Sequence, residues 1–136
     1  MYLLDTNACI AVINGKPRPV RIKLQKTFDD EVKVFVSSVV AFELWYGVAK
    51  SARTAANTQL LTAFFAGPVG LLVFDDEDAK IAGAVRASLE AAGKPIGAYD
   101  LLIAGQALRH RLTLVTANSR EVGRVKGLKW EDWGQG

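Results

Sequence analysis

The sequence predicts an α/β fold, a three-layer α/β/α arrangement with a mainly parallel sheet of four to five strands. The first observation is a set of short, mainly apolar runs, at residues 2–4, 32–36, 71–74 and 112–115. The second is that segments with helical spacing of apolar residues separate these runs. Strands that are apolar on both faces are typical of parallel sheets covered by helices. The 136 residues show no internal linker, so we expect one domain over residues 1–136.

Turn and capping residues set the element boundaries in the first half of the chain. Asn14-Gly15 is a helix stop, because glycine tolerates the left-handed backbone that ends many helices. Ser37 or Ser38 is suited to cap a helix, because a serine hydroxyl accepts a hydrogen bond from a free backbone N–H. In chain order we expect a strand at 2–4, a helix at 8–13, a helix after Pro17 and Pro19, a strand at 32–36, a helix capped by Ser37 or Ser38 and a helix at 53–66.

The second half continues the alternation of strand and helix. An acidic run, Asp75-Asp76-Glu77-Asp78, precedes a long helix that should end at Gly93. Negative charge is favourable at a helix N-terminus, so we interpret this run as a capping feature. The remaining elements are a strand at 71–74, a helix at 98–109 and a strand at 112–115 followed by Thr116-Ala117-Asn118.

Composition narrows the class of protein. Half of the residues are apolar, which indicates a chain that folds around a core. The net charge of +3 suits a phosphate-rich partner or, equally, a solvated basic surface. Cys9 is the only cysteine, so an intramolecular disulfide and a thiolate metal cluster are excluded, and we expect it to be a buried small hydrophobe. The sequence has no signal-peptide pattern and no membrane-spanning apolar stretch, so we expect a soluble cytoplasmic protein.

Polar residues at strand ends are the first candidates for a functional site, because ligands of open parallel sheets bind beyond the carboxyl ends of the strands. Asp5 directly follows the first predicted strand, and Asn118 follows the last. Glu43 lies on the helix after the second strand, and Asp100 lies in the first turn of the helix at 98–109. These side chains are therefore expected to meet at one edge of the sheet.

The three acids, Asp5, Glu43 and Asp100, are each embedded in apolar sequence. Grouped carboxylates repel one another, whereas a divalent cation favours their ionised forms. Since the candidate ligands are all oxygens, we expect Mg²⁺, with Mn²⁺ as a possible substitute. Such an ion activates water for phosphodiester hydrolysis without a nucleophilic side chain. His110, the only histidine, ends a helix between two arginines and is better interpreted as a surface residue than as a ligand.

Each acid also has a purely structural interpretation. Asp5 is a possible helix cap, Glu43 a possible partner of Lys50 or Arg53, and Asp100 a first-turn acid favoured by the helix dipole. For one residue alone the two interpretations are about equally supported. Convergence of all three acids favours a functional site.

Four segments carry a resemblance to a known family. They are Leu3-Leu4-Asp5-Thr6-Asn7, residues 37–44 with Glu43, residues 95–104 with Asp100, and residues 114–121 with Asn118 and Glu121. Together they resemble the PIN-domain toxins of VapBC toxin–antitoxin modules, and the resemblance covers nearly the whole chain. The closing segment 127–133 resembles the tail of the enteric-type VapC toxins.

The resemblance implies a Mg²⁺-dependent endoribonuclease that blocks translation and is silenced by a VapB antitoxin. In that family the acids matching Asp5 and Asp100 bind metal, the acid matching Glu43 completes the pocket, and Thr6 and Asn7 support it. Enteric-type members cleave initiator tRNA in its anticodon stem–loop, so tRNA is the expected substrate. The resemblance also implies a homodimer.

The chain departs from the family pattern after the last strand. Many PIN domains place a fourth aspartate where this chain has Asn118, with Glu121 nearby. Asn118 can accept a hydrogen bond through its carbonyl or orient a water, and Glu121 can supply the missing charge. The number of bound metal ions, one or two, therefore remains open. We keep Asn118 and Glu121 as candidate catalytic residues.

Partner contacts are suggested by basic and aromatic residues. Five basic residues near the site segments are candidates for RNA contact, although each is also a plausible solvated charge. Trp45 and Tyr46 either pack in the core or, with the helix at 53–66, form a groove for an amphipathic antitoxin segment. The basic candidates are Lys50, Arg53, Lys94, Arg120 and Arg124.

Three other functions compete with the ribonuclease. A PIN fold without catalysis, acting as the partner of an antitoxin repressor, is the main alternative, and the retention of three acids argues against it. A phosphomonoester hydrolase would need an Asp-x-Asp motif, but position 7 is asparagine. A receiver domain would need an acidic pair after the first strand, which is also missing.

Overall fold

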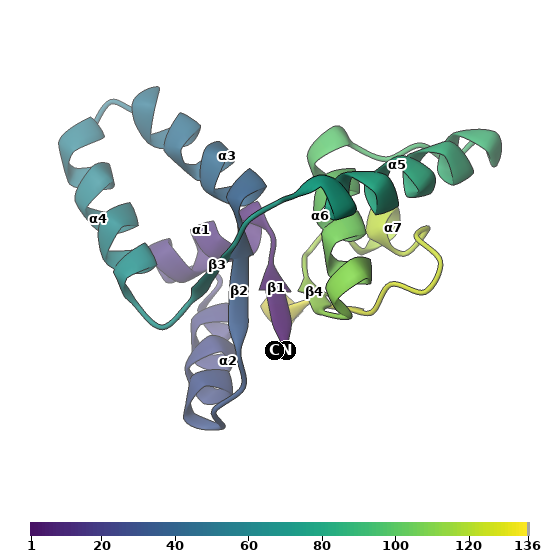
Figure 1. Cartoon of the computed structure of the whole chain (residues 1–136). Helices are drawn as coiled ribbons and strands as arrows, with labels where there is room; N and C mark the ends of the chain where they lie inside the picture. Colours follow the sequence, from purple (N-terminus) through teal and green to yellow (C-terminus); the bar gives the residue numbers. More distant parts are fainter. Residues whose placement is uncertain (136) are drawn as a thin grey trace.

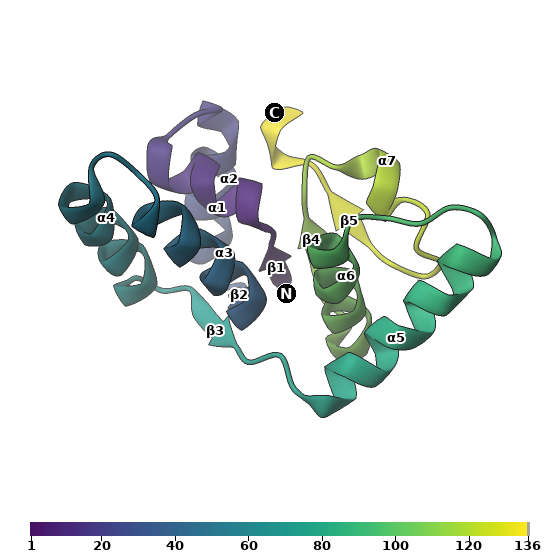
Figure 2. The same cartoon turned by 90° about the horizontal axis from the view of Figure 1, so that it is seen from above.

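A computed structural model describes residues 1–135 and confirms the α/β prediction. Five parallel strands form one sheet in the order β3-β2-β1-β4-β5. Helices α1 and α4 lie on one side of the strands and α5 and α6 on the other in both views (Figures 1 and 2). The elements are β1 Tyr2–Leu4, α1 Thr6–Asn14, α2 Arg18–Asp29, β2 Val34–Ser37, α3 Ser38–Ala49, α4 Thr54–Ala66, β3 Gly70–Leu72, α5 Asp76–Ala91, α6 Ala98–His110, β4 Thr113–Val115, α7 Ser119–Val122, β5 Trp130–Glu131 and a 3-10 turn at Trp133–Gln135.

The predicted helix boundaries are confirmed by the capping groups. Gly15 ends α1 with φ of 73°, in the left-handed region where glycine is favoured. The Ser37 hydroxyl accepts from the backbone N–H of Val39 and starts α3. The Asp75 and Asp78 side chains form a reciprocal capping box at the start of α5, which confirms the capping interpretation of the acidic run.

The strands differ from the prediction at their ends. The third strand stops at Leu72 rather than at residue 74, because the chain leaves the ladder there. The backbone N–H of Phe74 donates to the hydroxyl of Ser38, and the Gln106 amide donates to the carbonyl oxygens of Leu72 and Val73. Helix α7 and the two-residue strand β5 were not predicted, since such short elements carry almost no periodicity.

The core is built from the mainly apolar strands, as the parallel sheet requires. Leu3, Leu4 and Val36 are completely buried on the central strands, and Leu114 is nearly so. Cys9 is also completely buried, as predicted, and burial raises the pKa of its thiol well above the usual value. In residues 1–135 we find no helix with the length and apolar character needed to span a membrane.

Candidate active site

Strand order places a crevice between β1 and β4. The chain runs outward from β1 to β2 and β3, then returns to β4 on the other side of β1. The strand order therefore reverses between β1 and β4, and the helices that follow these two strands diverge. Open α/β sheets bind ligands at the point where the strand order reverses. In the sheet register, Leu4 pairs with Val36 on one side and with Val115 on the other. The residue that follows Leu4 is Asp5, which is thus brought beside Thr116.

Asp5 is a charged residue held at this crevice by the N-terminus of α1. Its side chain is 5% exposed, and its Oδ1 accepts the backbone N–H of Ala8 at 2.8 Å. Burial raises the pKa of Asp5, hydrogen bonds from Thr116 and Ala8 oppose that rise, and the negative charges of Asp100 and Glu43 add to it. Hydrogen bonds give the same grouping: Thr6, the residue after Asp5, contacts Glu43, and Thr116 and Asn118 connect Asp5 to Asp100.

Glu43 faces α1 from helix α3. The Thr6 hydroxyl donates to its Oε1 at 2.7 Å, a contact between residues 37 positions apart in the chain. Glu43 is therefore oriented by Thr6, rather than by Lys50 or Arg53 as the structural alternative proposed. Asn7 is exposed in the first turn of α1, and its side chain makes no hydrogen bond within residues 1–135.

Asp100, Asn118 and Glu121 form a second hydrogen-bonded group in the crevice. The Asn118 side-chain Nδ2 donates to Asp100 Oδ2 at 2.8 Å and to Glu121 Oε2 at 2.7 Å. Glu121 Oε1 also accepts the backbone N–H of Gly97 at 3.0 Å, which anchors the start of α6. The Asn118 amide lowers the pKa of Glu121, and the Gly97 bond adds to this effect. Asn118 thus joins two carboxylates as a donor through Nδ2, and the predicted role of its carbonyl as an acceptor stays a prediction.

Thr116 is a site residue that the sequence analysis did not assign. It is 2% exposed, hydrogen bonds to Asp5, and accepts the backbone N–H of Asn118 at 3.0 Å. It therefore links the aspartate after β1 to the asparagine after β4. A hydroxyl residue directly after an apolar strand was the available signal, but only the pairing of β1 with β4 gives it a partner.

The donor set fits a hard divalent cation. Within residues 1–135, no three His, Cys, Asp or Glu side chains are gathered closely enough to enclose a metal by themselves. Mg²⁺ does not require such a cage, since it usually keeps several waters and takes one or two carboxylates plus a substrate phosphate. Asp5 and Asp100 would supply those carboxylates, and a cation between them would offset the repulsion that raises the pKa of Asp5.

His110 lies outside this site, as expected. Its Nε2 is 3.3 Å from Asp78 Oδ1 but is not oriented for a hydrogen bond. The basic candidates are dispersed: Lys50, Arg53, Lys94 and Arg120 are exposed. Lys50 lies over the Tyr46 ring at 4.9 Å, and Arg124 donates to the Pro95 carbonyl at 3.0 Å.

Comparison with known proteins agrees with this fold. Residues 2–128 match the PIN domain family. The chain therefore belongs to the PIN-domain family, in its VapC branch. It is 39% identical over 97% of both chains to the "tRNA(fMet)-specific endonuclease VapC" of Shigella flexneri.

Two solved complexes have nearly the same fold. One is DNA-bound VapBC from Salmonella typhimurium, with a TM-score of 0.89, 36% identity and 97% of both chains covered. The other is VapBC2 from Rickettsia felis bound to a promoter DNA fragment, with a TM-score of 0.88, 34% identity and 96% of both chains covered. The likeness extends over nearly the whole chain in each case.

Proposed function

We propose that this chain is the toxin of a type II toxin–antitoxin module, a Mg²⁺-dependent endoribonuclease that hydrolyses phosphodiester bonds in tRNA. The observation that carries the proposal is a set of hydrogen bonds at the carboxyl ends of β1 and β4. Thr116 and Asn118 connect Asp5 to Asp100, and Thr6, the residue after Asp5, holds Glu43. Relatives that cover nearly the whole chain are named ribonucleases or tRNA(fMet)-specific endonucleases. Two of these names support initiator tRNA as the substrate. The family resemblance adds the anticodon stem–loop as the place of the cut, which would inhibit translation in the cytoplasm.

The chain's own residues have distinct tasks in this reaction. Asp5 and Asp100 would hold the ion, which supplies Lewis-acid activation of the phosphodiester and of the attacking water. The bond from Thr6 fixes Glu43 through Oε1, which leaves Oε2 to orient that water. Asn118 orients Asp100, and Glu121 fixes the start of α6, so these two residues position the site.

Purified, antitoxin-free protein is expected to cut total tRNA at discrete positions when Mg²⁺ is present. Mapping the new RNA ends identifies the substrate and the cleaved bond. Excess EDTA should abolish the cuts, Mn²⁺ should restore them, and Asp100→Asn should not cut. If folded, metal-binding protein leaves tRNA, ribosomal RNA and messenger RNA intact, the proposal is wrong and the chain is a non-catalytic partner module.

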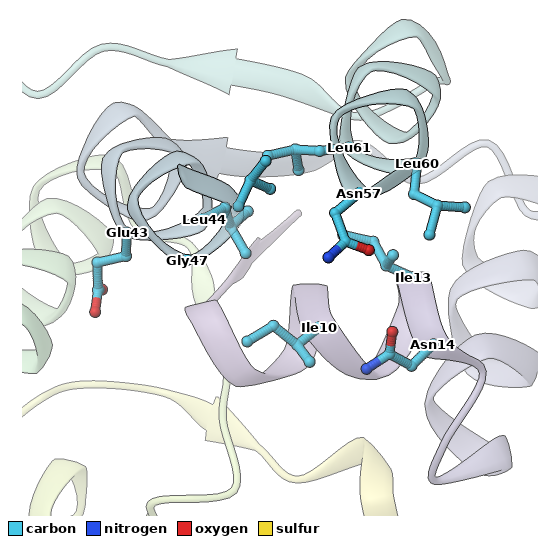
Figure 3. Close-up of a pocket in the computed structure, with 10 residues that line it drawn as sticks. Ile10, Ile13, Asn14, Glu43, Leu44, Gly47, Asn57, Leu60 and Leu61 are labelled. Atoms are coloured by element: carbon cyan, nitrogen blue, oxygen red, sulfur yellow. The ribbon is translucent and has the colours of Figure 1, made fainter. Parts of the chain in front are cut away.

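An apolar groove between α1, α3 and α4 is the proposed binding surface for the VapB-type antitoxin. Its volume is about 290 Å³, and Ile10 and Leu60 on its walls are 41% and 51% exposed. Figure 3 shows these apolar side chains from two helices facing the same space, with Glu43 at one end. An amphipathic helix that filled the groove would therefore reach the acidic site. The lining residues are Ile10, Ile13, Asn14, Glu43, Leu44, Gly47, Val48, Asn57, Leu60 and Leu61.

The aromatic residues next to this groove are not core residues. Tyr46 is 58% exposed, and Trp45 is 41% exposed and stacks on Phe65 of α4, with ring centroids 6.4 Å apart. Core packing, one of the two interpretations of these residues, is therefore wrong. The alternative is that both rings form the antitoxin groove with α4. Trp45 does contact α4 through Phe65, but neither Trp45 nor Tyr46 lines the groove described above. A homodimer stays part of the proposal, supported by the family resemblance.

Leu60→Lys is expected to weaken antitoxin binding by about 100-fold or more, because a charge would have to be buried in the filled groove. Leu71→Lys is the matched control, since Leu71 is a leucine 57% exposed on β3 and lies outside the groove. Binding is measured by titrating each variant with the VapB-type antitoxin encoded beside it. RNA cleavage without antitoxin should be unchanged in both variants. Equal antitoxin affinity for the two variants would contradict this assignment of the groove.

A further inference from the structure

Two exposed aromatic rings face one another across the gap between α3 and α6. Phe42 on α3 is 59% exposed and Tyr99 on α6 is 45% exposed. Their ring centroids are 6.2 Å apart and their planes are tilted by 42°. This pair contributes little to the core, because much of each ring remains in contact with solvent.

Each ring belongs to a residue that directly precedes a site acid. Phe42 is followed by Glu43 and Tyr99 by Asp100, and the two exposed rings contact each other, so the ring pair borders the segments that carry these acids. Tyr99 and Asp100 lie in the first turn of α6, whose start is fixed by the bond from Gly97 to Glu121. The same hydrogen bonds that position the acids therefore position the ring pair.

We propose that Phe42 and Tyr99 form a stacking platform for one unpaired base of the RNA, next to the phosphodiester that is cut. This inference rests on the proposed ribonuclease function and adds how the substrate is selected. Sequence-tolerant binding of single-stranded RNA depends on aromatic side chains that stack on bases. A base in a duplex is unavailable for such a contact, so the platform selects nucleotides in loops and bulges.

The occupant is inferred from the position of the rings. A phosphodiester bound by the site acids has a base on either side of it, and the exposed aromatic pair next to these acids lies within reach of such a base. The RNA is the occupant that has to reach the carboxylates in the proposed reaction, so we assign the ring pair to the RNA. A protein partner on the same rings is an outcome that the test below separates, because the ring variants would then change the oligomeric mass and leave the RNA affinity unchanged.

The proposal is tested by a double-mutant cycle between the rings and the RNA. The probe is a short RNA hairpin spanning the mapped tRNA cleavage site, made also with one abasic nucleotide at each position near the cut. Affinity is measured in an Asp5→Asn background, so that the RNA stays intact, and cleavage is measured in the otherwise wild-type chain. The ring variants are Phe42→Ala and Tyr99→Ala, with Phe42→Leu to preserve apolar volume. Ile22→Ala is the control, because Ile22 is 57% exposed on α2, away from this pair.

Each alanine variant is expected to bind the hairpin on the order of ten- to a hundred-fold more weakly. In the protein with both rings intact, an abasic nucleotide at one position of the hairpin should weaken RNA binding by a similar factor. In the alanine variants the same abasic nucleotide should leave the affinity almost unchanged. Phe42→Leu should lose part of the affinity, and Ile22→Ala none. Unchanged RNA affinity in folded alanine variants would overturn the proposal. If sedimentation also showed an altered oligomeric mass for these variants, the rings would instead form a contact between protein chains. Absence of cleavage by the wild-type chain, with the binding cycle intact, would instead count against the proposed function.

Discussion

Asp5→Asn is expected to lower the RNA cleavage rate by at least about 100-fold, because a ligand of the activating ion loses its charge. The fold should persist, because asparagine caps a helix as well as aspartate does. The bond from Ala8 to Asp5 Oδ1 can be made by an amide oxygen too. Cleavage of tRNA, with circular dichroism as the check on folding, measures this effect.

The same substitution is expected to raise the stability of the metal-free protein at neutral pH. Burial and the charges of Asp100 and Glu43 raise the pKa of Asp5 in the folded state. Between the unfolded and folded pKa values, the folded state holds more protons, so the free energy of unfolding falls as pH rises through that window. Above the window the full cost of the buried charge is present, and the uncharged amide of the Asp5→Asn variant avoids it.

Urea unfolding in EDTA across a pH series separates this effect from a simple packing change. The stability difference between Asp5→Asn and wild type should be largest at neutral pH and disappear below the window. Mg²⁺ should stabilise the wild type more than the variant. Asp29→Asn, at an exposed position on α2, is the control and should show neither effect. A variant that is less stable at every pH would show that the carboxylate is structural.

Arg109→Met is expected to cost on the order of 3 kcal/mol of stability, because the buried Asp78 loses its guanidinium partner. Of the side chains near it, Asp78 then keeps Gln106 and His110, each at 3.3 Å. Asp78 is completely buried, and its Oδ1 accepts a hydrogen bond from Arg109 at 3.0 Å. Arg109 also pairs with the exposed Asp75 and holds the pKa of that carboxyl at about 2. The guanidinium therefore joins the end of α6 to the start of α5.

A second substitution tests the cause of that loss. Asp78→Asn removes the buried charge but keeps an oxygen for the backbone N–H of Asp75, so the double variant should recover much of the stability. Arg86→Met is the matched control, since Arg86 forms an exposed pair with Glu90 at 3.0 Å. Exposed pairs contribute at most about 1 kcal/mol. Urea midpoints give the comparison, and a double variant as unstable as Arg109→Met would refute the buried-charge explanation.

The sequence alone was sufficient for the α/β fold and for most helix boundaries, because these depend on local chemistry. Mainly apolar runs predict buried strands, Gly15 predicts a helix end, and Ser37 predicts a helix start. Isolated acids after such strands also predicted that Asp5, Glu43 and Asp100 converge, because parallel strands share a common carboxyl edge. The structure connects these acids through Thr6, Thr116 and Asn118, and their joint role in catalysis stays a prediction.

Only the tertiary structure decided how those side chains are used. The strand that pairs with β1 is distant from it in the sequence, so local patterns do not identify it. The pairing of β1 with β4 gives Asp5 its contact with Thr116. The Asn118 bond to Asp100 joins residues 18 positions apart, and the Thr6 bond to Glu43 joins residues 37 apart. No local pattern encodes such contacts, because they depend on where separate elements pack. For the same reason, only the folded chain shows Phe42 and Tyr99 exposed together next to the site acids.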